Sequence, residues 1–257
     1  MNRQLPVGTC LGHAVKSVRN NIRHAFRISW PWLLILILLG GIVTIIFNYA
    51  GENNFVASFS ALLVWLLVAM MAGAAIAVHW HRYILVDEIS RVSEILRVDN
   101  KTWRYFGNVL LIAIIVSAVQ IIVMLPVRAA TWATATGELV ESFLSLIVAL
   151  VAGVLSYRLG VKLPAIALDR GDYRFADAWQ ATRGNDLRLL FVFLIQLVVS
   201  LIIFFVVYSL LISLAVLHPA LGVIGFVIFL VFLWLLSIFN ITILTSLYGF
   251  FVEGRDF

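Results

Sequence analysis

The side chains best suited to chemistry lie in the longest charged interruption of the chain, between Tyr157 and Arg188. This stretch combines several cations with one tryptophan. Guanidinium and ammonium groups bind phosphate oxygens, and tryptophan favours the membrane–water interface, so the combination indicates a surface that binds a phosphate or lipid headgroup, or that docks a protein. The residues of this predicted docking surface are Arg158, Lys162, Arg170, Arg174, Trp179 and Arg183.

A second candidate is the histidine pair His79 and His81, which flanks Trp80 and raises the question of metal or haem ligation. Residues two apart on a helix point about 200° away from each other, so these two cannot share one metal unless the helix unwinds. The sequence has no zinc-ligand spacing, phosphate-binding loop or nucleophile elbow. We therefore predict no catalytic residue, no metal and no cofactor.

The helix-breaking and helix-capping residues in this stretch predict the elements that position the docking surface. Pro164 lacks an amide hydrogen and opposes the preceding turn, which predicts a break or kink in the helix there. Asp172 is expected to cap a short interfacial helix, Gly184 to end it, and Asn185 or Asp186 to cap the next span. The apolar side of the short helix consists of Phe175, Ala178, Trp179 and Thr182.

The same stretch contains Leu163-Pro164-Ala165-Ile166-Ala167-Leu168, a turn at Asp169-Arg170-Gly171, and then Ala178-Trp179 and Thr182-Arg183-Gly184 ahead of an apolar span. It resembles the linker of the polytopic membrane domain found with some bacterial glycerophosphodiester phosphodiesterases and its stand-alone, uncharacterised relatives. The resemblance implies a polytopic membrane fold. It does not imply esterase activity, because that reaction belongs to a separate soluble barrel of roughly 250 residues, for which we expect no room here.

The composition indicates an integral membrane protein. Of the 257 residues, 63% are hydrophobic and 12% are charged, whereas soluble domains are roughly half apolar. The mean hydropathy is +1.07. The single cysteine, Cys10, excludes an internal disulfide and predicts a free thiol. The first thirty residues carry no acidic side chain and lead into a full span without a small-residue cleavage site, so we expect a retained segment and a bacterial inner-membrane protein.

Residues 1–28 form a basic N-terminal segment that is expected to be a single amphipathic helix from His13 to Ile28. Its cations either hold the helix against an anionic leaflet, at about 1 kcal/mol each, or only enforce topology. The apolar stripe is Val15, Val18, Ile22, Ala25 and Phe26. The basic stripe of this predicted interfacial helix is Lys16, Arg19, Arg23 and Arg27.

Six transmembrane helices are predicted, joined on the cytoplasmic side by linkers 79–107 and 164–188. Pro31 is expected in the first turn of span one and Pro126 at the end of span three, while span two can continue to Val86. Residues 87–97 are expected to form an amphipathic helix, and Asp99 or Asn100 to cap the next one. The spans cover about residues 33–49, 55–78, 109–125, 139–163, 189–217 and 220–251.

The distribution of charge predicts the orientation. Of the 18 lysines and arginines, only Arg128 falls in the loops opposite the two linkers, so the positive-inside rule places both termini in the cytoplasm. Three times the chain repeats an amphipathic helix, a span, a short outer turn and a returning span. This predicts a single transmembrane domain of three helical hairpins, each preceded by an amphipathic interfacial helix.

Small residues recur every four positions on two spans, which predicts seams where helices approach closely. The two seams suggest that spans two and four touch. The seam residues are Ala69, Gly73 and Ala77 on span two, and Ala152, Ser156 and Gly160 on span four.

These features together predict a non-enzymatic inner-membrane protein that contacts lipids or acts as an accessory or scaffold subunit of a membrane assembly. The expected partners are anionic lipids of the cytoplasmic leaflet and other membrane proteins, and no nucleic acid. The absence of charges deep inside the spans argues against a proton pump. The alternatives are a small permease or lipid transporter gated near Pro164 and, third, a haem- or metal-binding membrane protein.

Overall fold

The computed structural model describes residues 3–50, 54–131 and 136–257, and all regular structure within them is helical. The helices are α1 (Val7–Asn20), α2 (Ile22–Ala50), α3 (Phe55–Val86), α4 (Val92–Ile95), α5 (Asn100–Thr131), α6 (Gly137–Gly160), α7 (Lys162–Ala167), α8 (Phe175–Ala181), α9 (Asp186–Leu217) and α10 (Pro219–Phe251). Six segments of this described part are long and apolar enough to cross a membrane: α2, α3, α5, α6 with α7, α9 and α10. The predicted class, an all-helical multi-pass membrane protein, is confirmed.

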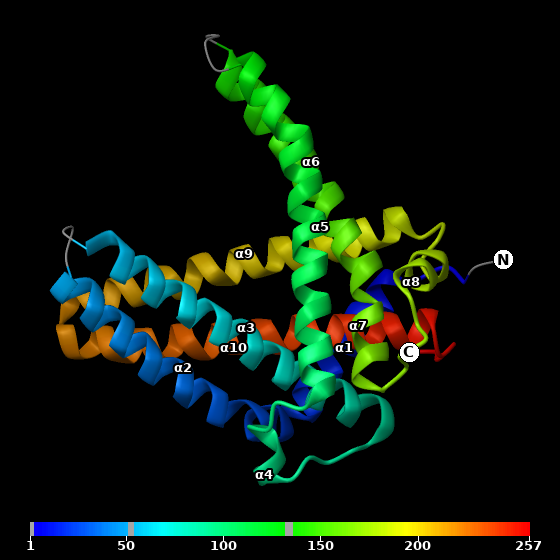
Figure 1. Ribbon diagram of the computed structural model, residues 1–257, viewed down its shortest axis with the longest axis horizontal. Helices are drawn as coiled ribbons and strands as arrows, with labels where there is room; N and C mark the ends of the chain where they lie inside the picture. Colours follow the sequence, from blue (N-terminus) through cyan, green and yellow to red (C-terminus); the bar gives the residue numbers. More distant parts are fainter. Residues whose placement is uncertain (1–2, 51–53, 132–135) are drawn as a thin grey trace.

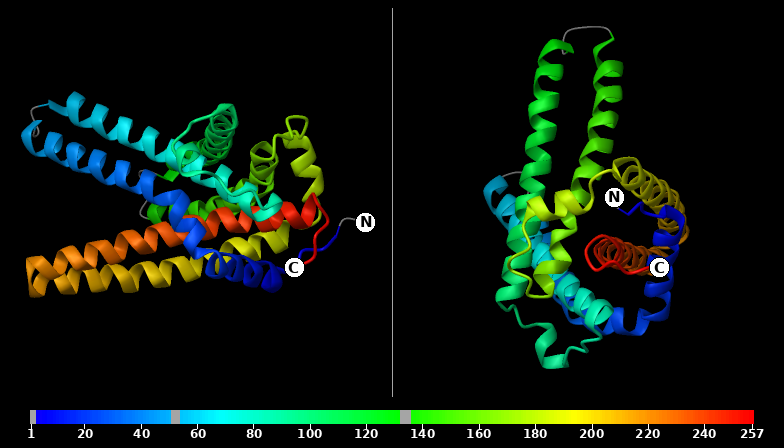
Figure 2. Two further views of the ribbon diagram at one scale, coloured as in Figure 1. Left: turned by 90° about the horizontal axis from the view of Figure 1, so that it is seen from below. Right: turned by 90° about the vertical axis from the view of Figure 1, so that its right-hand side faces the viewer.

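The long helices pack in sequence-neighbouring pairs, α2 with α3, α5 with α6, and α9 with α10. The axes of α2, α3, α9 and α10 are broadly aligned, whereas the α5–α6 pair projects steeply away from them (Figure 1). Both termini, α1, α7 and α8 gather where the pairs meet (Figure 2). We call this region the junction.

The buried core lies at the junction. One cluster joins α1, α9 and α10 to the junction ends of α3 and α6 and to α7 and α8, a second joins α2, α3, α4 and α10, and a third joins α3, α5, α6 and α7. Farther out the helices expose large apolar side chains, and only 6% of the most apolar window of α9 is buried inside the protein. Such surfaces are favourable against lipid, where helices already satisfy their own backbone hydrogen bonds.

Two prolines lie inside long helices instead of bounding them. Helix α2 begins nine residues before Pro31, and α5 continues past Pro126 to Thr131. The predictions that Pro31 occupies a first turn and that Pro126 ends span three are wrong. A proline costs about 3 kcal/mol in a helix interior, but each backbone group left unpaired in an apolar phase costs several kcal/mol, so the helix continues.

The basic N-terminal segment is two helices and not one, because the chain turns at Asn21 between α1 and α2. Asn21 donates its backbone amide to the carbonyls of Ser17 and Val18. The predicted apolar stripe is divided: Ala25 is buried, whereas Val15 is exposed. The four predicted cations all lie on the exposed side: Lys16, Arg19, Arg23 and Arg27.

Residues 87–97 do not form the predicted amphipathic helix. Asp87 has a φ of 55°, which ends α3, and only the single turn α4 follows. Glu88 pairs with Arg82 at the end of α3 instead of with a neighbour in its own segment. Asp99 caps α5 as predicted, accepting the amide hydrogen of Thr102 at 2.9 Å.

The predicted small-residue seams do not meet. Gly73 is exposed, and a Cβ built on it would have nothing within 4 Å. Helix α3 packs mainly on α2, α5 and α10, whereas α6 packs mainly on α5 and α9. On α6 the close approaches are at Gly153, which the seam omits, and at Gly160. A Cβ at Gly153 would lie 2.6 Å from the Phe193 ring, and one at Gly160 would lie 2.9 Å from Leu244.

Candidate functional site

The docking surface begins at a change of direction between α6 and α7. Pro164 is the third residue of α7, and the break falls one turn earlier, at Gly160 and Val161. Because Pro164 has no amide hydrogen for the carbonyl of Gly160, the helix is weakest there. Beyond α7, Asp169 has a φ of 60° and turns the chain. Its carboxylate is 3.2 Å from the ammonium of Lys101.

Helix α8 carries the tryptophan of the docking surface. Its N-cap residue is Arg174 and not the predicted Asp172, and the carboxylate of Asp177 accepts the Arg174 amide hydrogen at 2.6 Å. Gly184 has a φ of 80°, so the predicted left-handed stop is confirmed. Trp179 remains 46% exposed.

Arg158 is the centre of the site. The residue is 7% exposed, and its guanidinium donates from Nε to Thr182 Oγ1 at 3.1 Å, from Nη1 to Asp186 Oδ1 at 2.6 Å and from Nη2 to the Trp179 carbonyl at 2.9 Å. Its Cζ atom also lies 3.7 Å from the centre of the Trp179 ring. Arg158 therefore joins α6 to α8 and to the start of α9, and it is placed as an internal cross-link instead of a headgroup ligand.

The other predicted cations do not converge on Arg158. Lys162 Nζ lies 3.9 Å from the ring centre of Phe175. Arg170 lies 3.6 Å from the carboxylate of Glu253 beyond α10. Arg174 and Arg183 are exposed at the two ends of α8. Of the six predicted residues, Arg158 and Trp179 are thus in contact, and the other four do not join them.

A groove opens beside Arg158, between α6 and the start of α9. Its volume is about 600 Å³. Trp179, Arg158 and Asp186 lie at one end, and aliphatic side chains form the rest of its wall. The aliphatic lining is Ile147, Leu150, Val151, Val154, Leu155, Leu187 and Leu190. Sequence reasoning missed this groove because α6 and α9 meet only in the folded chain.

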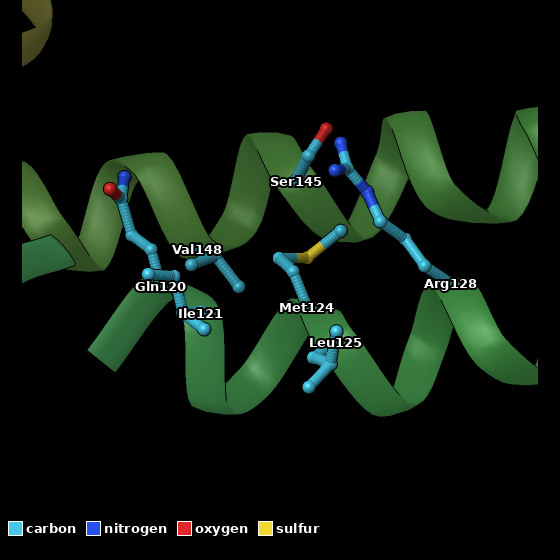
Figure 3. Close-up of a pocket in the computed structure, with 7 residues that line it drawn as sticks. All are labelled: Gln120, Ile121, Met124, Leu125, Arg128, Ser145 and Val148. Atoms are coloured by element: carbon cyan, nitrogen blue, oxygen red, sulfur yellow. The ribbon is translucent and has the colours of Figure 1, made fainter. Parts of the chain in front are cut away.

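A smaller pocket of about 290 Å³ lies between α5 and α6 (Figure 3). Arg128 extends from α5 toward Ser145 on α6, and Met124 points between the two helices (Figure 3). The Nε of Arg128 is 2.5 Å from a carboxylate oxygen of Glu141. This ion pair joins the two helices and neutralises the charge beside the pocket.

The two histidines have separate partners. His81 is fully buried, with Nδ1 2.8 Å from Thr245 Oγ1 and Nε2 3.1 Å from the Tyr105 hydroxyl. It therefore connects α3, α10 and α5. His79 Nδ1 is 2.7 Å from Ser90 Oγ. Among the described residues, no group of three or more His, Cys, Asp or Glu side chains is placed to hold a metal ion.

Asn185 is the N-cap residue of α9, as predicted, but its side chain makes no capping hydrogen bond and instead clamps the N-terminal segment. Its Oδ1 accepts the amide hydrogen of Leu5 at 2.8 Å, and its Nδ2 donates to the carbonyl of Arg3 at 3.0 Å. Arg188 donates from Nη1 to the Leu5 carbonyl at 2.8 Å. Leu5 is fully buried, so these bonds satisfy polar groups that water does not reach.

We expect Asn185→Ala to lower the free energy of unfolding by about 1–3 kcal/mol, because it leaves a buried amide hydrogen of Leu5 without an acceptor. Denaturant titration in detergent measures the change. The control is Asn108→Ala, since Asn108 is half-buried and its side chain makes only an exposed hydrogen bond within α5, to the Arg104 carbonyl at 2.8 Å. Equal loss of stability in the two variants would contradict a clamping role for Asn185.

Comparison with protein-family models, with curated proteins and with solved structures finds no match. The function is therefore inferred from the geometry of the chain alone.

Proposed function

We propose that the chain is a non-enzymatic multi-pass protein of the bacterial inner membrane that contacts lipid headgroups through its cation-rich junction, with both termini in the cytoplasm. The observation that carries this proposal is the separation of charge from apolar surface. Apart from Arg128, the lysines and arginines of the described residues occupy α1, the first turns of α2, and the helix ends and linkers next to the junction. The six apolar segments extend away from it (Figure 1).

The positive-inside rule assigns the junction to the cytoplasmic face, and the three paired helices then act as three membrane hairpins. In this arrangement α1 and α8 lie at the interface. Lys16 and Arg19 on α1, and Arg23 and Arg27 at the start of α2, are all exposed. Each cation at an anionic surface contributes about 1 kcal/mol, so the four act together on headgroups of the cytoplasmic leaflet.

The topology is testable with single cysteines placed at Arg91 and Arg174, which are exposed at the junction, and at His218, the exposed turn between α9 and α10. In intact cells, a membrane-impermeant maleimide is expected to label the cysteine at 218 and to spare those at 91 and 174. All three become labelled after the membrane is permeabilised. Labelling of 91 and 174 from outside would reject the proposed orientation.

The native thiol supplies a silent background for this test. Burial raises the pKa of Cys10 to about 12. At pH 7 to 8 the thiolate fraction is then on the order of a thousandfold below that of a free cysteine, so alkylation is slow until the protein unfolds.

Lipid contact is tested by charge removal. We expect the combined variant Lys16→Gln, Arg19→Gln, Arg23→Gln and Arg27→Gln to lose its enrichment in phosphatidylglycerol over phosphatidylcholine of equal chain length. Native mass spectrometry of protein extracted from mixed bilayers measures the enrichment. Because the four side chains are exposed, the free energy of unfolding should change by no more than about 0.5 kcal/mol for each of the first three changes. Arg27 also donates to the Ser90 carbonyl at 3.2 Å, so its replacement is expected to cost about 1 kcal/mol. Retained enrichment in the folded variant would reject a headgroup role for these cations.

A further inference from the structure

The α6–α9 groove has two chemically different ends. Along α6, from Ile147 to Leu155, its wall is aliphatic, and Val151 in the middle is 55% exposed. At the other end are Arg158, Trp179 and Asp186. An exposed apolar channel that ends in charged and aromatic groups matches an amphiphile, which has an apolar tail and a polar head.

The length of the groove matches one membrane leaflet. Ile147 and Arg158 are eleven residues apart on one helix, which corresponds to about 16 Å along its axis. Half of the hydrocarbon core of a bilayer is about 15 Å thick. A lipid with its headgroup at the Arg158 end would therefore lay one acyl chain along the aliphatic wall.

At the polar end of the groove the positive charge of Arg158 is already paired with a carboxylate, and this pairing decides which type of headgroup can bind. The side chain of Arg158 is only 8% exposed, and its charge is balanced by Asp186, whose side chain is 54% exposed. Asp186 accepts from Arg158 through Oδ1. The outward-facing groups are therefore the rest of the Asp186 carboxylate and the half-exposed indole of Trp179. A carboxylate and the face of an aromatic ring both attract a cation, and the carboxylate repels a phosphate.

We infer that this groove binds one phospholipid whose headgroup carries a hydrogen-bonding ammonium, with that ammonium at Asp186 and Trp179 and an acyl chain along α6. The inference rests on the proposed membrane function and adds to it one site with a defined lipid specificity. The exposed cations of α1 and α2 attract anionic lipids in general, whereas the groove selects an amine. Arg158 is a positioning residue that holds the carboxylate and the indole at the mouth of the groove.

The test uses the full chain in bilayers that contain phosphatidylethanolamine, phosphatidylcholine and phosphatidylglycerol with identical chains, followed by native mass spectrometry of the extracted protein. One charge-assisted hydrogen bond to Asp186 should favour the ethanolamine lipid by about tenfold over the choline lipid, whose nitrogen has no hydrogen to donate. Asp186→Asn should remove most of this preference.

Two matched variants separate the groove from the remaining lipid surface. Val151→Trp fills the groove and is expected to abolish the tightly held lipid. Leu146→Trp is the control, because Leu146 is 56% exposed on the same helix but does not line the groove. Both substitutions add bulk to an exposed position, so the unfolding midpoints of the two variants should remain close to that of the parent protein.

The outcomes also distinguish this inference from the proposed function. Loss of the ethanolamine lipid in Val151→Trp but not in Leu146→Trp supports the groove site. Equal retention of the three lipids, or retention unaffected by Val151→Trp, overturns it. Enrichment of phosphatidylglycerol that depends on the α1 and α2 cations but not on Val151 leaves the proposed function standing and rejects the groove. Absence of any retained lipid rejects both.

Discussion

Replacing Arg158 with methionine is expected to lower the free energy of unfolding by about 2–4 kcal/mol, measured by denaturant titration in detergent. Methionine keeps much of the apolar stem but removes all three donors, which leaves the Thr182 hydroxyl and the Trp179 carbonyl without this partner. Removing one member of a fully buried ion pair costs about 3–5 kcal/mol. The figure here is lower because the Asp186 side chain is 54% exposed and water can partly solvate it.

Two further variants define the origin of this loss. Arg174→Met is the matched control, because Arg174 is exposed and contributes its backbone to the α8 cap. The free energy of unfolding of this control should change by no more than about 0.5 kcal/mol. Arg158→Lys should recover part of the loss, since an ammonium can still reach Asp186 but cannot present the planar fork of a guanidinium. Full recovery by lysine would show that charge alone matters and that the three-way geometry does not.

The six spans follow from the sequence because hydropathy over about 20 residues is a local property. The cap at Asp99 and the stop at Gly184 are local too, since each involves residues within one or two turns. Their positions agree with the structure. The prolines show where local rules fail: the propensity of Pro126 predicts an end, but the apolar environment favours an unbroken helix.

The candidate site depends on contacts that are distant in the chain. Asn185 occupies the N-cap position of α9, which the sequence predicts, but its side chain bonds to Leu5, 180 residues away, which the sequence does not predict. The charge of Arg158 predicts a ligand-binding role, but the carboxylate that neutralises it belongs to the next long helix. Counting cations along the chain thus overestimates the free positive charge at this surface, and the groove beside it escapes notice.

One close contact between α6 and α9 depends on a glycine. A Cβ on Gly153 would lie 2.6–2.7 Å from three atoms of the Phe193 ring. That ring is itself fixed edge-on against Tyr157, with the ring centres 6.4 Å apart. Because the clash reaches Cγ as well as the ring edge, the ring cannot escape by a small rotation. Either Phe193 or helix α9 must move.

We therefore expect Gly153→Ala to destabilise the protein by about 1–3 kcal/mol through overpacking, although alanine is the better helix former by about 1 kcal/mol. Gly73→Ala is the control, since Gly73 is also inside a long helix but has open space around a new Cβ. There the helix-forming gain acts alone, so stability should stay equal or rise by up to about 1 kcal/mol. Opposite signs for the two substitutions, measured by denaturant titration in the same detergent, would place the close helix contact at α6 and α9. A destabilising Gly73→Ala with a neutral Gly153→Ala would instead support the small-residue seam on α3.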